Sequence, residues 1–199
     1  MKTRNLLMIA LFALTSLSFG SNAFAQDAKK AQPTYKVDPV HSNVLFRVKH
    51  TDISFIYGQF LKFDGTVKYD PAKVGDTSIA WTVQTDSVFT NQRQRDEHLK
   101  NADFFNAGQY PTITFKSKKV TRKGADKFEV VGDLTLNGVT RPVTTLVTVT
   151  GNGKDQEGKD RYGFHTEFSI ERSKHGMAFM VGPVSDKVDL TVSTQVVAQ

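Results

Sequence analysis

Residues 134–149 read LTLNGVTRPVTTLVTV, and this stretch decides the fold class. Asn137-Gly138 separates the alternating run Leu134-Thr135-Leu136 from a β-branched run between Val143 and Val149. Asn-Gly between two such runs is the strongest short-range signal of a β-hairpin, because its turn requires a positive φ at both central residues. We therefore expect two antiparallel neighbouring strands here.

The same period-two alternation recurs on both sides of this hairpin, from Thr34 onward. Apolar and polar residues alternate within each run, and clusters of Gly, Pro, Asn and Asp separate the runs, which is typical of half-buried strands. Eight strands are predicted in this way, through residues 44–50, 59–69, 79–85, 113–117, 128–136, 143–149, 162–170 and 188–196.

Eight antiparallel strands with one apolar face each can close into a barrel or pack as two sheets. Closure removes exposed edges, and the longer runs suit the tilted strands of a barrel, so we predict an all-β fold with an eight-stranded antiparallel barrel. One short helix is expected over Arg95–Phe105, in the connection between the third and fourth strands. Leu99, Ala102 and Phe105 recur there at three-residue spacing, and acidic residues lie early.

Residues 1–25 have the three parts of a secretory signal peptide. Lys2 and Arg4 precede an apolar run from Leu6 to Phe19, and Ala23-Phe24-Ala25 offers small residues at a cleavage site. The apolar run is shorter than the ~20 residues that a spanning helix needs, so we expect cleavage rather than stable membrane insertion. The prediction is a single domain over residues 26–199, located in the periplasm.

Composition excludes several kinds of chemistry. The chain has no cysteine, which rules out disulfides, thiol catalysis and zinc-thiolate sites. The formal net charge of +6 falls to +4 without Lys2 and Arg4, which is a mild excess. The densest basic stretch, residues 116–123, is interpreted as solvated strand-edge residues. We expect no nucleic-acid partner for an exported protein.

The interior of an eight-stranded barrel is either just filled by side chains or just wide enough for one small ligand. The fifteen Phe of the chain suit a filled core and an apolar cavity equally well, so the pattern leaves both open. The predicted ligand-facing residues share the inward register of their strands. They are Phe46, Val48, His50, Phe63, Trp81, Phe115, Phe128, Phe164 and Phe168.

Polar residues around the predicted helix raise the alternative of an enzyme. Asp96 and His98 are two residues apart, so on a helix they point in different directions and a direct relay between them is disfavoured. The sequence contains no G-x-S-x-G elbow, H-E-x-x-H pair or glycine-rich phosphate loop, and its five histidines lack metal-ligand spacing. We therefore expect neither an enzyme nor a metal site. Arg95 and His98 are candidates to meet a ligand head group, with a helix-start network of Arg95 and Asp96 as the alternative.

The chain resembles the YceI-like polyisoprenoid-binding family over nearly all of residues 26–199. The matching pieces, in order, are His41-Ser42, His50, Tyr57-Gly58-Gln59-Phe60, Phe63-Asp64-Gly65, Ser87 with Thr90, Arg95-Asp96-Glu97-His98-Leu99, Ala102-Asp103-Phe104-Phe105, Tyr110-Pro111, Phe115 with Ser117, and Gly132 to Thr140 before Pro142-Val143. One departure is Arg172-Ser173-Lys174-His175-Gly176-Met177, where the family often has an acidic and an aromatic residue before glycine.

This resemblance implies a lipocalin-like barrel with an elongated apolar cavity, periplasmic in Gram-negative bacteria, that binds an isoprenoid or similar amphipathic lipid. It implies no known reaction, and no cofactor other than the bound lipid. A carrier, storage or sequestration role remains open, as does a homodimer. The alternatives are an envelope stress or interaction protein with a filled barrel, and an enzyme acting on an isoprenoid or other lipid.

Overall fold

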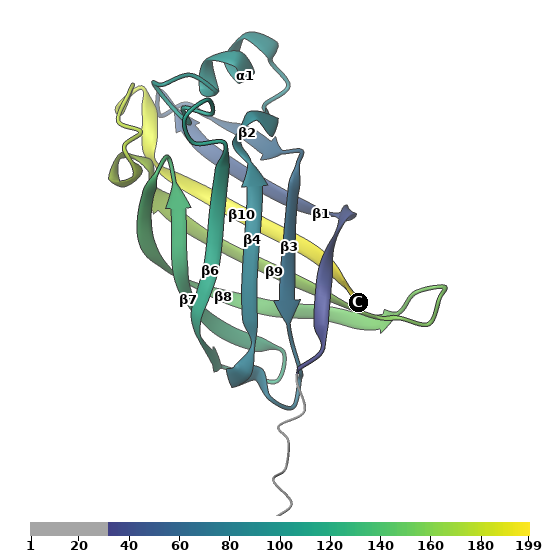
Figure 1. The fold of residues 1–199 in the computed structure, drawn as a ribbon. Helices are drawn as coiled ribbons and strands as arrows, with labels where there is room; N and C mark the ends of the chain where they lie inside the picture. The colour runs from purple at the N-terminus through teal and green to yellow at the C-terminus, as the bar shows by residue number, and fades with distance from the viewer. Residues whose placement is uncertain (1–31) are drawn as a thin grey trace, which may run out of the picture. The chain divides into compact units, whose positions relative to one another are not determined.

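The computed structural model describes residues 32–199, so the predicted signal peptide lies outside the described residues. The described part is a closed antiparallel β-barrel with one short α-helix at one end (Figure 1). The prediction of an eight-stranded barrel with a helix between its third and fourth strands is confirmed.

The elements of residues 32–199 follow one another with short connections. In chain order they are β1 (Thr34–His50), β2 (Ser54–Phe60), β3 (Phe63–Lys68), η1 (Val74–Asp76), β4 (Ser78–Gln84), η2 (Thr85–Ser87), β5 (Val88–Phe89), α1 (Arg93–Leu99), β6 (Thr112–Arg122), β7 (Lys127–Leu136), β8 (Val139–Lys154), β9 (Asp160–Glu171), η3 (Arg172–His175) and β10 (Val184–Ala198), where η marks a 3-10 turn.

The sheet closes because β10 pairs both with β9 and with β1. The strand order is β10-β9-β8-β7-β6-β4-β3-β1-β2-β5. The predicted strand through residues 59–69 is broken at Leu61-Lys62, which separates β2 from β3, and both of these pair with β1. The predicted strand through residues 79–85 corresponds to β4, and η2 separates β4 from the two-residue β5. Counting β2 with β3 and β4 with β5 gives the eight staves of the barrel.

The hairpin that decided the fold class has the expected geometry. Leu136 pairs with Val139 across the turn, and the two central residues have positive φ, 51° for Asn137 and 74° for Gly138. These values are those of a type I′ turn, whose twist matches that of the flanking strands.

The helix is shorter than predicted, since α1 covers Arg93–Leu99 rather than Arg95–Phe105. It begins earlier because the Gln92 side chain caps it, accepting a hydrogen bond of 2.6 Å from the Arg95 N–H.

The helix ends at Leu99 because the next residues fold into successive turns. The Phe105 N–H donates to the Leu99 carbonyl, and the Asn106 N–H donates to the Asn101 carbonyl, instead of continuing the helical ladder. In a helix, successive side chains point about 100° apart. The turns instead bring Phe104 and Phe105 to the same end of the barrel, where both line one cavity.

Side chains alternate between the two faces of the strands, as the sequence predicts. In β1, Val44 and Phe46 are buried inside the barrel while Leu45 and Arg47 are exposed. Two apolar clusters result. The cluster at the α1 end contains Val44, Phe46, Phe60, Val83, Val88 and Val188, and the other contains Tyr35, Val37, Val67, Tyr69, Val74, Val120, Phe128, Val130, Val147, Phe164 and Val196.

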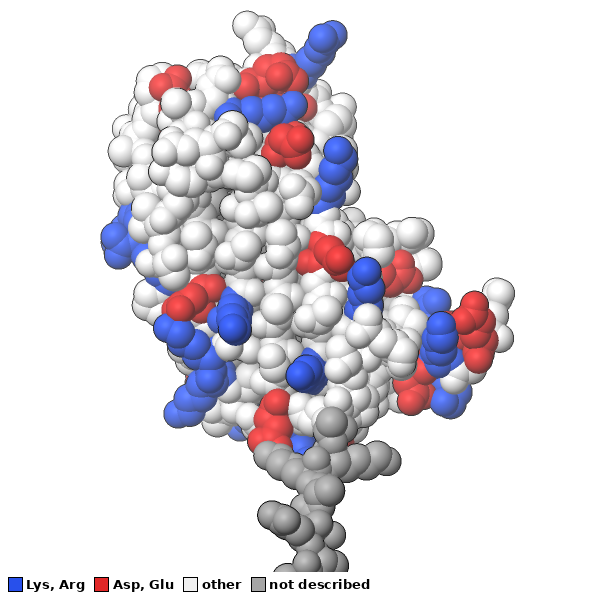
Figure 2. Space-filling view, viewed as in Figure 1, with Lys and Arg blue, Asp and Glu red and all other residues white. Residues whose placement is uncertain are grey.

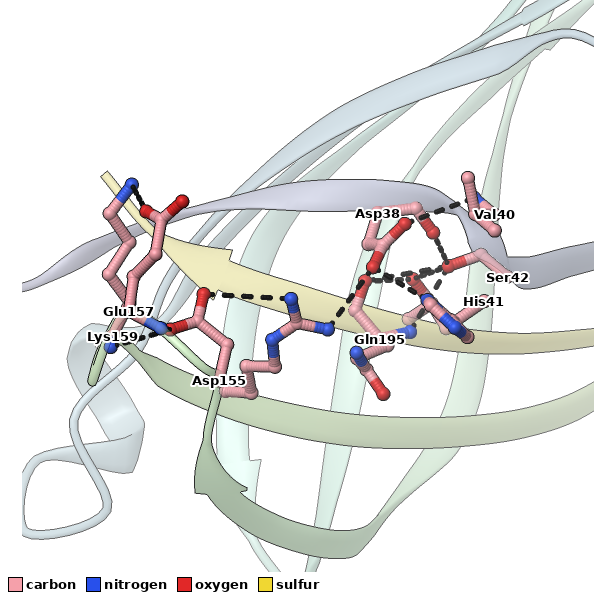
Figure 3. A network of polar contacts seen from close by, with 10 residues as sticks. Asp38, Val40, His41, Ser42, Asp155, Glu157, Lys159 and Gln195 are labelled. Atoms are coloured by element: carbon pink, nitrogen blue, oxygen red, sulfur yellow. Dashed lines mark hydrogen bonds and ion pairs between the residues drawn. The ribbon is translucent and has the colours of Figure 1, made fainter.

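A polar network holds the β8–β9 hairpin against a bulge in β1 (Figure 3). The register between β1 and β10 shifts between Asp38 and Asn43. The Asp38 carboxylate contacts His41 Nδ1 at 2.8 Å and Arg161 Nη1 at 3.4 Å, and Arg161 Nη2 lies 3.5 Å from Asp155. The hydrogen bond with His41 lowers the pKa of Asp38. This network stabilises the closure of the barrel.

Charged residues are dispersed over the face shown in Figure 2, with blue and red side chains often adjacent. The basic stretch of residues 116–123 follows this pattern. Lys118 lies 2.7 Å from Asp133, and Lys123 lies 3.2 Å from Glu129, both partners being on β7. These lysines therefore belong to exposed cross-strand ion pairs rather than to a single-sign patch.

Candidate functional site

The barrel encloses an apolar cavity of about 140 Å³, called the barrel cavity below. Its lining comes from all eight staves and includes Val44, Phe60, Val67, Ile79, Trp81, Val83, Ile113, Phe115, Phe128, Val130, Leu134, Val143, Val147, Phe164, Phe168, Leu190 and Val192. Alternation places these side chains inward because each stave has one apolar face. The barrel is therefore not completely filled.

Four threonines also line the barrel cavity: Thr114, Thr145, Thr166 and Thr194. The hydroxyls of the last three are engaged in the wall. Thr145 Oγ1 and Thr166 Oγ1 are 2.5 Å apart, and the Thr166 hydroxyl donates to the Leu146 carbonyl at 2.9 Å. Thr194 Oγ1 lies 3.0 Å from the Ser42 hydroxyl. Since these groups satisfy one another and the backbone, the wall stays apolar in character.

Beyond this cavity, at the end of the barrel remote from α1, aromatic side chains of the second apolar cluster fill the interior. The Tyr69 ring contacts the Tyr162 ring at a centroid distance of 5.0 Å and the Phe164 ring at 5.2 Å. Tyr35 meets Tyr162 at 5.4 Å, and Phe128 stacks on Tyr69 at 6.0 Å. Burial raises the pKa of the Tyr35 and Tyr69 hydroxyls. This cluster limits how deep a ligand can reach.

A second cavity of about 290 Å³ lies at the α1 end and is called the mouth chamber below. Strands β1, β2, β6, β7, β9 and β10 supply one part of its wall, and Arg172 of η3 supplies another. The α1 connection and the loop after η3 supply the rest, through Thr90, Arg95, His98, Leu99, Phe104, Phe105, Met177 and Met180.

Four side chains line both cavities, so the two adjoin. These are Phe60, Ile113, Leu134 and Leu190. All four are apolar and together form the waist between the mouth chamber and the barrel cavity. An elongated ligand could therefore lie along the barrel with its two ends in different surroundings.

Aromatic contacts cover the mouth chamber. The Phe105 ring meets Phe60 of the waist, and the Phe104 ring meets Phe179 of the loop after η3 at a centroid distance of 5.6 Å. The His98 ring lies against both Phe104 and Phe179, at 5.1 and 5.8 Å, and its Nε2 is 3.0 Å from Asp103. The α1 connection and this loop thus meet over the chamber.

Thr90 is the centre of a network at the start of α1. Its hydroxyl donates to the buried Asp96 carboxylate at 2.5 Å and accepts from Arg95 Nε at 2.7 Å. Arg95 Nη2 donates to the Thr90 carbonyl at 2.8 Å. The helix-start network expected for Arg95 and Asp96 is therefore present. The guanidinium also lines the mouth chamber, so the two interpretations of Arg95 are compatible.

Arg172 is a second guanidinium on the chamber wall and is 3 % exposed. It donates to four backbone carbonyls, at 2.7 Å to Met177 and Phe179 and at 3.0 Å to Val184 and Ser185. Burial lowers the pKa of this guanidinium from its usual value. Arg172 thus fixes the loop between η3 and β10 that supplies Met177 and Met180 to the chamber.

His175 is 2 % exposed and lies where the chain departs from the pattern expected of its relatives. Its Nδ1 is 3.1 Å from the Val139 carbonyl, next to the β7–β8 turn. Burial lowers the pKa of the imidazole, and nearby Arg141 adds to this effect. The ring packs η3 against the turn rather than contacting the chamber.

The charge of the mouth chamber is one-sided. Its lining contains two guanidinium groups, from Arg95 and Arg172, and two imidazoles, from His50 and His98, but no Asp or Glu among the described residues. The rest of the lining is mostly apolar, and a guanidinium on such a wall stabilises an anionic or carbonyl-bearing group, because charges interact more strongly away from bulk water.

The structure brings together ten of the eleven residues that the sequence singled out. Trp81, Phe115, Phe128, Phe164 and Phe168 line the barrel cavity, and Phe46, Val48, His50, Arg95 and His98 line the mouth chamber. Phe63 lies outside both cavities, because its ring packs against Trp81 at a centroid distance of 5.6 Å.

Several lining residues were not foreseen. Phe104, Met177 and Met180 belong to irregular segments, where periodicity gives no register. Leu190 could have been found, because it falls in the inward register of the predicted strand through residues 188–196. Phe60 could not, because in the predicted strand through residues 59–69 it lies on the opposite face from Phe63, and it points inward only because the strand breaks at Leu61-Lys62. Within residues 32–199 there is no group of three or more His, Asp or Glu side chains arranged to hold a metal ion, and no helix with the length and hydropathy of a membrane span.

Comparison with known proteins identifies the family. Residues 35–196 match the model of the YceI-like domain, which spans the barrel from β1 to β10. The chain belongs to the YceI-like family. A YceI-like relative is Protein YceI of Escherichia coli O157:H7, which is 40% identical over 189 residues, covering 94% of this chain and 98% of that protein.

Two solved structures share the YceI-like barrel. The crystal structure of BcnA from Burkholderia cenocepacia has a TM-score of 0.74 at 29% identity and covers 80% of this chain and 98% of its own. A polyisoprenoid binding domain from Saccharophagus degradans has a TM-score of 0.69 at 15% identity and covers 84% and 100%. At 15% identity, the similarity to the Saccharophagus degradans domain shows a shared fold only.

Proposed function

We propose that this YceI-like protein binds a long-chain amphipathic lipid, with a polyisoprenoid as the first candidate. The tail lies in the barrel cavity and the head group in the mouth chamber. The observation that carries the proposal is the junction, at a waist of four apolar side chains, of an apolar cavity with a second, mostly apolar chamber whose wall carries the guanidinium groups of Arg95 and Arg172.

The binding energy available to an apolar tail is sufficient. Burying one CH₂ group contributes roughly 0.8 kcal/mol, so a tail of about 15 carbons contributes on the order of 10 kcal/mol before the costs of ordering. Micromolar binding needs about 8 kcal/mol. Once the costs of ordering are subtracted, the tail alone supplies slightly less than this, and a head-group contact adds the remainder.

The head group meets Arg95 and His98 in this proposal. Arg95 Nε and Nη2 each donate to Thr90, which fixes the plane of the guanidinium, while Nη1 has no hydrogen-bond partner among the described residues. A guanidinium held in this way matches the oxygens of a phosphate or diphosphate. His98 lies on the same wall and is held by Asp103.

A binding role, rather than catalysis, agrees with how the polar side chains of the chamber are used. Thr90 and Arg95 hold the start of α1, and Arg172 holds the loop after η3. The Saccharophagus degradans domain that shares this fold is a polyisoprenoid binding domain, which supports the ligand class. The tripartite N-terminus supports a periplasmic carrier, storage or sequestration protein.

Uptake of a fluorescent polyene, cis-parinaric acid, tests the proposal. Phe168→Asp and Phe46→Asp place a carboxylate on the wall of the barrel cavity and of the mouth chamber, and either change should abolish uptake. Phe55→Asp is the matched control, because Phe55 is 47 % exposed on the outer face of β2. Full uptake by folded Phe168→Asp and Phe46→Asp proteins would reject the cavity as the binding site.

A further inference from the structure

Phe46 and Gly58 are direct cross-strand partners on β1 and β2. A Cβ atom added to Gly58 would lie 2.2 Å from Cζ of the Phe46 ring, and 2.6 and 2.8 Å from its two Cε atoms. The tip of the ring therefore occupies the space that any side chain at position 58 would need. The ring lies against the barrel wall at the one position of β2 without a side chain.

The backbone does not require glycine at this position. The glycines with positive φ are Gly138, Gly158, Gly176 and Gly182 among the described residues, and Gly58 is not one of them. All three close neighbours of the added Cβ are atoms of the Phe46 ring rather than backbone. Alanine is therefore compatible with the strand at position 58, provided that the ring moves.

The ring borders the mouth chamber. The lining of this chamber of about 290 Å³ includes Phe46, and the neighbouring Phe60 ring lies at a centroid distance of 5.7 Å. A ring displaced from Gly58 would enter the chamber, next to the waist that Phe60 helps to form.

The same arrangement recurs deeper in the barrel. A Cβ atom on Gly132 would lie 2.5 Å from Cζ of Phe115, which lines the barrel cavity, and one on Gly65 would lie 3.2 Å from Cδ2 of Trp81. These two positions also approach backbone carbonyls, at 2.6 and 2.8 Å, so a side chain there would disturb the sheet as well. Gly58 is the position where the effect on the ring can be isolated.

We infer that Gly58 sets the bore of the mouth chamber by letting the Phe46 ring lie against the wall, and so sets the space open to a lipid chain on its way to the waist. This inference rests on the proposed function and names a residue that determines affinity without touching the ligand's head group. A bulkier residue at position 58 narrows the path to the barrel cavity while leaving Arg95 and His98 in place.

Titration with cis-parinaric acid and with farnesol tests this role in Gly58→Ala. If the displaced ring takes the place of about two CH₂ groups of ligand, the Kd rises about tenfold for both probes. The double variant Gly58→Ala/Phe46→Leu has a shorter side chain facing the new methyl group and should bind within about threefold of the original protein. Gly151→Ala is the matched control, because a Cβ there meets no atom within 4 Å.

Unchanged affinity in a folded Gly58→Ala protein would overturn the inference, as would a double variant that folds and still binds weakly. If Gly58→Ala fails to fold, the double variant and the single Phe46→Leu variant show whether the Phe46 ring or the backbone causes the failure to fold. A crystal structure of Gly58→Ala supplies a readout without lipid: the inference requires the Phe46 ring to be displaced into the chamber. Absence of binding by the original protein would contradict the proposed function, whereas the ring position tests Gly58 separately.

Discussion

The ring of Phe105 meets the ring of Phe60 edge to face, with centroids 5.4 Å apart and planes at 73°. Phe60 belongs to the waist between the two cavities, and Phe105 belongs to the turns that follow α1. This contact fastens the connection that covers the mouth chamber to the barrel wall. Edge-to-face pairs contribute about 0.5–1.5 kcal/mol beyond the area they bury.

Phe105→Ala should loosen the connection that covers the mouth chamber. We expect faster release of bound cis-parinaric acid, by about tenfold, and a loss of about 2 kcal/mol in the free energy of unfolding, since Phe105 is only partly buried. Stopped-flow displacement measures the release rate. Phe89→Ala is the control, because Phe89 is 38 % exposed and lies outside both cavities. An unchanged release rate in the folded Phe105→Ala protein would show that the contact does not retain the ligand.

Arg95→Ala should discriminate between two ligands with the same tail. Affinity for farnesyl diphosphate should fall roughly tenfold to a hundredfold more than affinity for farnesol, since hydrogen bonds to charged groups contribute about 1.5–3 kcal/mol. The comparison with farnesol corrects for any loss of affinity that comes from loosening the contacts between Arg95 and Thr90. Arg93→Ala, an exposed position on the same helix, should leave both affinities unchanged. Equal losses for the two ligands would reject a head-group role for Arg95.

The burial of His175 should make the fold sensitive to mild acid. Its pKa is lowered in the folded protein, so the unfolded chain binds the proton more readily. The stability gained from a neutral His175 is therefore present above pH ~6.5 and is lost as the pH falls through the lowered pKa, by at most about 1.4 kcal/mol per pH unit.

Urea unfolding between pH 7.5 and pH 5 measures this effect. His175→Phe keeps a ring in the same packing position and should show a smaller loss of stability over this range. Parallel pH profiles for the two proteins would contradict the assignment to His175.

Asp189 should make the free energy of unfolding depend on pH at more acidic values than His175 does. Hydrogen bonds from Ser169 (2.7 Å), from Lys187 and from Arg47 (2.9 Å) lower its pKa to about 2. Its stabilising effect is therefore present above pH ~4 and is lost as the pH falls through about 2. Asp189→Asn should lower the free energy of unfolding at neutral pH by about 1 kcal/mol, allowing for solvent screening, and should reduce the acid sensitivity below pH 4. Asp52→Asn, whose side chain is 87% exposed, should change neither quantity.

The barrel could be predicted from sequence because its signals are local. The Asn137-Gly138 turn and the alternation within each strand depend on residues next to one another in the chain, and eight of the residues that alternation puts inward line the two cavities. Phe63 lines neither, because alternation distinguishes inside from outside but does not show which inward ring is covered by another, here Trp81.

The mouth chamber could not be predicted in the same way, because it depends on contacts between distant segments. The end of α1 is set by turns that let Phe105 reach Phe60, and the loop after η3 is set by the carbonyls that surround Arg172. The three-residue spacing of Leu99, Ala102 and Phe105 predicts a longer helix than the one present, and the loop after η3 has no periodic pattern. The relation between Gly58 and Phe46 also requires the register of β1 and β2, which the sequence does not give by itself.

Native mass spectrometry of the purified protein, followed by organic extraction, tests the central claim most directly. We predict a bound isoprenoid or fatty-chain species in a one-to-one complex, lost in Phe168→Asp and retained in Phe55→Asp. A mass equal to that of the polypeptide alone, unchanged when farnesol or cis-parinaric acid is added, would contradict a lipid-binding barrel and would favour a scaffold whose cavities stay empty.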